Sequence, residues 1–384
     1  MTDDLPTNPA LLPAGLRDLL PPDAETEAAA VEQLMAVFAG HGYQRVKPPL
    51  LEFEDSLLAG SGAAVAEQTF RLMDPDSQRM MGLRADTTPQ VARIATTRLA
   101  GAPRPLRLSY AGQCLRVRGS QLAPDRQVAQ AGIELIGADH AEADAEMILV
   151  GAEALAAIGL TRLSFDLTLP TLVPLMLDAA GIVGAQRSAL AHALDRKDAA
   201  AVGRHGGVLA GVLGDLLLNA GPAARALSAL GAADLPAPAR ALAARLEAVV
   251  AHVGAVAPDL RLTVDPVEFR GFRYETGVSV TIYAPDRHEE LGRGGRYLCN
   301  ETEPATGLTL YPDALLRAAP ARMARPRLYL PAGTPPATAA ALRGQGFATI
   351  AALGDAAEDA MAEARRLLCT HVLHNGAAIA VQPA

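Results

Sequence analysis

The chain has 384 residues, which at about 150 residues per domain predicts two or three domains with a large core. Its net charge of −8 argues against a general nucleic-acid coat, and its 50% apolar content excludes wholesale disorder. Seven Tyr, seven Phe and no Trp are too few for a carbohydrate reader that depends on aromatic stacking.

The cysteines and the terminal segments indicate a cytoplasmic protein. Cys114, Cys299 and Cys369 lie far apart in the sequence and form no Cys-x-x-Cys pair, which argues against a disulfide framework or a cysteine zinc site. The acidic N-terminus runs directly into prolines, unlike a signal peptide. The long uncharged runs at 328–342 and from 367 onward are interrupted by prolines or polar residues, so we expect no membrane span and no membrane partner.

The first hundred residues predict two helices and a hairpin. Apolar residues at i, i+3, i+4 and i+7 predict a helix that Asp23 caps and that ends near Gly40. Two apolar-rich stretches on either side of residues 74–77 predict a hairpin turn. Thr88, followed by proline, predicts the start of the second helix.

Two long antiparallel strands are predicted at 106–117 and 127–137. Alternation on the second strand places Gln130, Gly132 and Glu134 on one face, with small and aliphatic residues on the other. An amide and a carboxylate separated by glycine leave room for a small ligand. Alternation alone favours a polar face toward solvent over a ligand site.

The rest of the chain predicts a helical insertion followed by more strands. Asp139-x-x-Glu142 resembles a capping box for a helix to about 158, and the alanine- and leucine-rich residues 170–258 form the predicted insertion. Strands are predicted at 261–265, 277–283 and 306–311, and strand–helix alternation near the C-terminus predicts a small α/β element. We therefore expect a domain at 1–325 that includes the insertion, and a second domain at 326–384.

Three local patterns suggest chemistry without defining it. Arg293 to Tyr297 reads as a glycine turn, and His371-x-x-His374 on a strand is a weak metal pattern with no third ligand nearby. The interval between Asp86 and Asp125 contains six arginines and no acidic residue. This interval could bind a phosphate or carboxylate, could form a subunit interface, or could reflect coding bias. Its arginines are Arg93, Arg98, Arg104, Arg107, Arg116 and Arg118.

Six segments, in order, resemble the histidyl-tRNA synthetase group over residues 10 to 320. They begin at Pro13-Ala14-Gly15-Leu16-Arg17-Asp18 and continue through Leu83-Arg84-Ala85-Asp86-Thr87-Thr88-Pro89. Motif 2 and its adjoining strand are similar to Leu115-Arg116-Val117-Arg118 and Gln130-Ala131-Gly132-Ile133-Glu134. The remaining segments are Arg270-Gly271 with Tyr274, Gly294-Gly295-Arg296-Tyr297, and Ala305-Thr306-Gly307-Leu308 as the start of motif 3.

The departures from that group fall on the side that would hold ATP. Arg118 stands where the synthetases have an acid that contacts adenine, and Ala314 stands near the expected motif 3 arginine. Arg273 and Glu275 replace an aspartate and a tyrosine of the histidine motif. The C-terminal piece is also too short for a complete anticodon-binding domain. Because adenylation depends on electrostatic complementarity to ATP, the resemblance predicts no aminoacylation.

The chain thus resembles the regulatory subunits of the short-form ATP phosphoribosyltransferase, which are paralogues of histidyl-tRNA synthetase. The resemblance implies an α+β, class II synthetase-like antiparallel sheet of six to seven strands flanked by helices. It also implies no catalytic residue, metal or cofactor of its own, and a dimer within a hetero-octamer with the catalytic subunit that starts histidine biosynthesis. Nucleic acid is not an expected partner.

Histidine is the ligand that the resemblance implies. Asp86 would receive its ammonium group, Arg270 its carboxylate, and Glu134 with Gln130 its imidazole. Arg116 and Tyr274 complete the predicted site: Asp86, Arg116, Gln130, Glu134, Arg270 and Tyr274.

Three alternatives stay open at this point. The effector histidine could bind at a subunit boundary instead, where Arg116 or Arg118 would serve the interface. The chain could also be a divergent histidyl-tRNA synthetase, or a stand-alone histidine sensor or RNA-binding relative.

Overall fold

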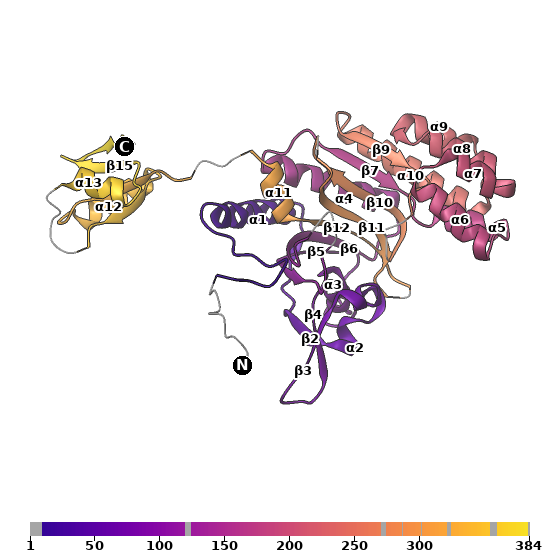
Figure 1. Cartoon of the computed structure of the whole chain (residues 1–384), viewed down its shortest axis with the longest axis horizontal. Coiled ribbons are helices and arrows are strands. Elements are labelled where there is room, and N and C mark those ends of the chain that lie inside the picture. Colours follow the sequence, from indigo (N-terminus) through magenta and orange to yellow (C-terminus); the bar gives the residue numbers. More distant parts are fainter. Residues whose placement is uncertain are drawn as a thin grey trace, which may run out of the picture. The chain divides into compact units, whose positions relative to one another are not determined.

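A computed structural model describes residues 10–119, 124–269, 274–285, 287–300, 302–320, 324–353 and 359–382. The chain divides into two compact units, residues 1–320 (unit 1) and residues 321–384 (unit 2) (Figure 1). The division comes five residues before the sequence-based boundary at 325. Each unit has a sheet and a hydrophobic core of its own.

Unit 1 is built on a mostly antiparallel sheet of nine strands, rather than the six to seven expected. The two parallel pairings of this sheet lie toward its edges, between β1 and β5 and between β7 and β9. In spatial order the strands are β1 (Gln44–Arg45), β5 (Leu106–Leu115), β6 (Gln127–Ile136), β12 (Pro304–Leu310), β11 (Glu290–Leu298), β10 (Glu275–Tyr283), β7 (Ser164–Thr168), β9 (Arg261–Asp265) and β8 (Gly221–Pro222).

Helices cover the two faces of this sheet differently. Apolar residues of α1 (Asp23–Gly40), α4 (Ala141–Ala157) and α10 (Ala237–Val256) form the main core with Ala131, Ile133 and Leu135 of β6. On the other face, α3 (Thr88–Thr96) packs on a smaller cluster that includes Tyr110 and Tyr297. The predicted alternation of β6 is therefore correct, and its polar residues face the α3 side.

A second, three-stranded sheet lies beside α3, with the spatial strand order β2-β4-β3. Its strands are β2 (Leu51–Phe53), β3 (Phe70–Met73) and β4 (Met80–Leu83), accompanied by α2 (Glu54–Leu57) and the 3-10 helix η1 (Gly60–Gln68). The predicted hairpin is formed by β3 and β4, where the Asp74 carboxylate accepts hydrogen bonds from the turn residue Ser77. α11 (Pro312–Ala318) follows β12 and packs near β6 and β11.

The segment predicted as a helical insertion is a series of helices next to β7 and β9 (Figure 1). The last of them, α10, packs against α4, which places the insertion in the main core. The two-residue strand β8 also comes from this segment and pairs with β9. The helices preceding α10 are α5 (Leu172–Ala179), α6 (Gly184–Asp195), α7 (Ala199–His205), η2 (Gly207–Leu209), α8 (Ala210–Leu218) and α9 (Ala223–Ala232).

The glycine segment 293–297 is not a turn, as the sequence suggested, but the middle of strand β11. Glycine is required there for close packing: a Cβ on Gly294 would lie 2.1 Å from the Gly307 carbonyl oxygen of β12. The physical inference of close backbone approach was correct, and the assigned local structure was wrong.

A cluster of charges takes up Asp139, which the sequence predicted as part of the cap of α4. α1 starts at Asp23 itself, and α4 starts after His140, with no side-chain cap in either case. Asp139 instead lies 2.8 Å from Arg245 and 3.3 Å from Arg296. Asp144, which is 0% exposed, pairs with the same two arginines at 2.7 and 2.8 Å. The cluster joins α4, the insertion helix α10 and strand β11.

Unit 2 is a four-stranded sheet with two helices. Its strand order is β14-β13-β15-β16, with β13 parallel to both β14 and β15. The predicted alternation is correct, and one antiparallel strand is added at the end. The elements are β13 (Arg327–Leu330), α12 (Pro336–Gly344), β14 (Ala348–Ala351), α13 (Ala360–Arg366), β15 (His371–His374) and β16 (Ala377–Ala380).

Neither a membrane span nor a metal cluster is found in the described part of the chain. No helix there is long and apolar enough to cross a membrane. No group of His, Cys, Asp and Glu in the same residues is arranged to hold a metal ion. His371 instead packs its ring edge-on against Phe347 at 5.2 Å between centroids.

Candidate functional site

A cavity of about 790 Å³ lies over the α3 face of the large sheet. Five of the six predicted site residues line it, although they come from widely separated segments. Asp86 precedes α3, Arg116 follows β5, Gln130 and Glu134 lie on β6, and Tyr274 directly precedes β10. The sixth predicted residue, Arg270, lies outside the described residues.

Asp86 is held at the cavity by two side chains. Gln130 Nε2 donates to Asp86 Oδ1 at 3.2 Å, and the Tyr274 hydroxyl donates to Asp86 Oδ2 at 3.1 Å. Gln130 Oε1 in turn accepts from the backbone N–H of Thr87 at 3.0 Å. Gln130 is thus oriented toward Asp86 rather than toward Glu134. The carboxylate is fixed in position and carries a charge that an ammonium group can meet.

Glu134 lies at the floor of the cavity and is 1% exposed. Its two oxygens accept hydrogen bonds at 2.8 Å from the hydroxyls of Thr88 and Tyr297. Burial raises the pKa of this carboxyl to about 8, so near pH 7 it is mainly neutral and carries an O–H. Such a group can donate a hydrogen bond to a ligand nitrogen that lacks a proton.

The absence of a side chain at position 307 gives access to Glu134. A Cβ on Gly307 would lie only 1.9 Å from Glu134 Oε2. Gly307 on β12 pairs directly with Glu134 on β6. Glycine is therefore required beside this carboxyl.

Two arginines of the interval without acidic residues differ in their position. Arg116 lines the cavity, and its Nε contacts the Ala85 carbonyl oxygen at 3.5 Å. Arg118 is exposed and does not line the cavity. Other members of the interval are structural: Arg93, Arg104 and Arg107 pair with Glu52, Glu303 and Glu146.

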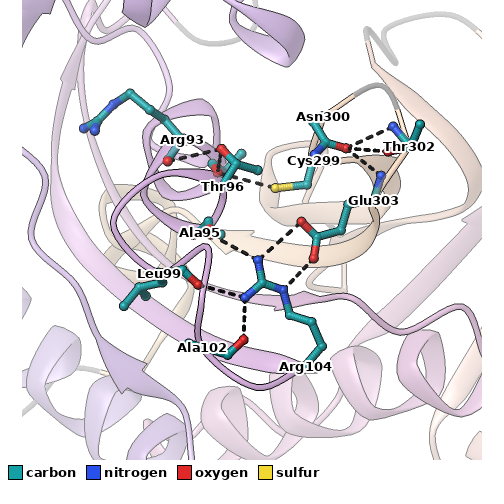
Figure 2. Close-up of polar contacts among 11 residues, drawn as sticks. Arg93, Ala95, Thr96, Leu99, Ala102, Arg104, Cys299, Asn300, Thr302 and Glu303 are labelled. Carbon is teal, nitrogen blue, oxygen red and sulfur yellow. Dashed lines mark hydrogen bonds and ion pairs between the residues drawn. The ribbon is translucent and has the colours of Figure 1, made fainter.

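The C-terminal end of α3 is fixed by Arg104 (Figure 2). Its guanidinium donates to the carbonyl oxygens of Ala95, Leu99 and Ala102, at 3.1, 2.9 and 3.0 Å. Its Nε also donates to Glu303 Oε1 at 2.6 Å, just before β12. Because α3 begins beside Asp86, this anchor also fixes the cavity end of the helix.

The opposite part of the cavity contains an arginine that the sequence analysis missed. Ala314 is buried, as expected for a site without the motif 3 arginine, but Arg317 on the same helix lines the cavity. Its guanidinium is paired with Glu289. The spacing of three residues along α11 was the available signal, since residues i and i+3 share a helix face.

Asp313 binds groups of the chain itself. Its Oδ1 accepts from Arg17 Nη2 at 3.1 Å, and its Oδ2 accepts from the backbone N–H of Ala129 at 3.0 Å. Asp313 and the neighbouring Asp125 both line the cavity, and Arg17 also lies 3.8 Å from Asp125. Arg17 is therefore paired with carboxylates of the chain itself, near the place where a synthetase would bind a phosphate.

Carboxyl groups outnumber guanidinium groups around the cavity. The arginines that line it are Arg116, Arg293 and Arg317. The acidic residues that line it are Asp86, Asp125, Glu134, Glu275, Glu289, Glu290 and Asp313. A cavity with this charge favours a cationic or zwitterionic ligand over a polyphosphate.

Comparisons with known proteins identify the fold and the family of the chain. A family profile described as Histidyl-tRNA synthetase matches residues 15–315. A solved structure from Bacillus halodurans, described as an ATP phosphoribosyltransferase regulatory subunit/histidyl-tRNA synthetase, superposes with a TM-score of 0.77 at 24% identity, covering 92% of this chain and 95% of that one. A histidyl-tRNA synthetase from Nostoc also gives 0.77, at 18% identity, covering 95% and 91%. The fold and the cavity define a class II aminoacyl-tRNA-synthetase-like protein, which confirms the predicted fold class.

Curated relatives define the family more narrowly. A protein from Paramagnetospirillum magneticum named ATP phosphoribosyltransferase regulatory subunit is 58% identical, covering 95% of this chain and 96% of its own. A protein of the same name from Rhodospirillum centenum is 55% identical, covering 98% of both. The chain belongs to the family of ATP phosphoribosyltransferase regulatory subunits. The name of this family describes a regulatory rather than a catalytic subunit, in agreement with the sequence-based prediction.

Glu134 is expected to make folding stability fall as the pH rises. Its pKa is about 8 when folded and returns toward 4.5 when unfolded, so between these values the folded state binds the extra proton. Stability should therefore decrease by up to about 1.4 kcal/mol per pH unit across this window and level off above it. Denaturant unfolding of the wild-type chain and Glu134→Gln from pH 5 to 9 checks this expectation. A stability difference that stays constant with pH would contradict it.

Proposed function

We propose that this chain binds histidine and regulates the catalytic subunit of a short-form ATP phosphoribosyltransferase, at the first step of histidine biosynthesis. In this proposal it activates the catalytic subunit and also transmits feedback inhibition by histidine. The names of the relatives support the regulatory role and the identity of the partner. ATP and phosphoribosyl pyrophosphate are handled by that partner, and this chain supplies no catalytic group.

The observation that carries the proposal is the pairing of a fixed Asp86 with a neutral, buried Glu134 in one acidic cavity. Asp86 receives the ammonium group, and Tyr274 and Gln130 hold its two oxygens. Glu134 donates its O–H to an imidazole nitrogen. Arg270 binds the ligand carboxylate, and Arg116, on the wall of the same cavity, adds positive charge beside it.

Regulation follows if histidine binds the more and the less active arrangements of the complex with unequal affinity. A coupling of about 1–3 kcal/mol changes the relative population by roughly 5- to 150-fold. We place this chain as a dimer inside a hetero-octamer with the catalytic subunit. We propose the dimer because the resemblance to class II synthetases implies one.

Mixing the two purified subunits tests the proposal. Transferase turnover is measured with the catalytic subunit alone and with increasing amounts of this chain, in the presence and absence of histidine. We expect turnover to rise on addition of the chain and histidine inhibition to require it. Equal turnover and equal inhibition with and without the chain would refute the proposal, whereas histidine-dependent pyrophosphate exchange by the chain alone would indicate a synthetase.

A further inference from the structure

Five exposed arginines gather at one edge of unit 2, which we call the arginine edge. β13, β14 and β15 run parallel, and the register pairs Arg327 with Ala348 and Leu328 with His371, so all three strands start at this edge. Helices α12 and α13 end next to the same strand starts, because each leads directly into β14 or β15 (Figure 1). The members are Arg325 and Arg327 before and at β13, Arg343 on α12, and Arg365 and Arg366 on α13.

The described residues of unit 2 neutralise the arginine edge only weakly. Arg366 pairs with Glu363, and Arg343 donates to the Thr349 hydroxyl at 3.1 Å. Arg325, Arg327 and Arg365 form no ion pair with any described residue. Residues 321–384 contain six basic and four acidic residues, for a net charge of +2, which leaves −10 for residues 1–320.

Leu368 adds an apolar group to this edge that folding does not explain. It follows α13, where its N–H bonds to the Arg365 carbonyl oxygen at 2.9 Å, and its side chain is 78% exposed. Its backbone has φ +53°, a left-handed conformation that disfavours a branched side chain and favours glycine or asparagine at the end of a helix. A residue that gains neither burial nor a favourable conformation indicates a role outside the folded chain.

We propose that the arginine edge with Leu368 is a docking surface for an acidic protein surface, and that this surface lies on the catalytic subunit. The partner is taken from the proposed function, on which this inference rests. Guanidinium groups would pair with carboxylates of the partner, and Leu368 would fill an apolar depression between them. Cationic side chains around one apolar anchor combine fast, steered association with slow dissociation.

An acidic protein fits this surface better than RNA. Single-stranded RNA is bound largely by stacking of bases on exposed aromatic rings. Among Tyr, Phe and Trp, unit 2 has only Tyr329 and Phe347. Tyr329 is buried, and Phe347 is half-buried with its ring against His371.

The test compares two variants with the same change in net charge. Arg343→Ala/Arg365→Ala removes two charges from the arginine edge, and Ala332→Glu/Ala337→Glu adds two negative charges at the opposite end of the strands, where both alanines are exposed. The rate of association of the full chain with the short-form catalytic subunit is measured at several salt concentrations. We expect about a 10-fold lower rate at low salt and a weaker salt dependence for the arginine variant, and no change for the control.

Leu368→Asn tests the apolar group separately. Asparagine tolerates the left-handed conformation, so the fold should be kept or stabilised, while the affinity for the catalytic subunit should fall about 10-fold through faster dissociation. Wild-type rates for both the arginine variant and Leu368→Asn would overturn the inference and leave the proposed function intact. Loss of binding to total tRNA, or of self-association, with unchanged subunit binding would also overturn it. A wild-type chain that does not bind the catalytic subunit at all would refute the proposed function and this inference together.

Discussion

An Asp86→Asn variant is expected to bind histidine about 100-fold more weakly than the wild-type chain, a loss of about 3 kcal/mol. The substitution keeps the shape of the side chain but removes the charge that would meet the ammonium group. It also offers N–H donors to Tyr274 and Gln130, whose own donors now point at Asp86. Titration calorimetry with histidine measures the loss.

Asp125→Asn is the matched control for this measurement. Asp125 lines the same cavity but lies beside Arg17 and Asp313, away from the residues that hold Asp86. We expect its histidine affinity to stay within about threefold of wild type, because a partly exposed ion pair contributes little. Equal losses in the two variants would mean that the cavity acts through its net charge and not through a specific ammonium site.

The largest loss of stability is expected from Asp144→Asn, at about 3–5 kcal/mol. Asp144 is fully buried between Arg245 and Arg296, and Arg296 is itself almost fully buried. Removing the carboxylate charge leaves two guanidinium groups without their main partner in a dry environment. Denaturant unfolding of the full chain, followed by circular dichroism, measures the change.

Asp178→Asn provides the comparison for that loss. Asp178 also pairs with an arginine, Arg187, but the Asp178 side chain is 63% exposed and the Arg187 side chain 34%. Its loss should cost no more than about 0.5 kcal/mol, since exposed ion pairs are worth little. Similar losses for the two variants would show that the buried cluster contributes no more than a surface pair.

The parts of the site that could be predicted depend on short-range patterns in the sequence. Alternation along β6 placed Gln130 and Glu134 on one face, and the structure shows that face toward the cavity. The resemblance supplied Asp86 and Tyr274, which lie far apart in the chain and are joined by a hydrogen bond. No local pattern could have shown that Gln130 orients Asp86, because that contact depends on how α3 is held over β6.

The misread elements have a common physical origin. Gly294 and Gly295 favour a turn by local preference, yet both lie within β11. Strand β12 approaches Gly294 closely and Ser279 of β10 approaches Gly295 closely, so neither position has room for a side chain. Asp139 fits a helix cap by its spacing, but two arginines from distant elements, Arg245 and Arg296, bind it instead. In both cases tertiary contacts outweigh the local preference, and such contacts are not visible in a single sequence.

The connection between β7 and β9 has a consequence for shortening this protein. These strands are parallel neighbours, so the chain must cross from the end of one to the start of the other, and the helices α5 to α10 are that crossover. A tight hairpin cannot replace them, and removing them would also take away β8, which pairs with β9, and the arginine that α10 contributes to Asp144. A minimal version of unit 1 therefore needs a designed bridge of about a dozen residues or more, and Asp144 must be kept because it still pairs with the buried Arg296.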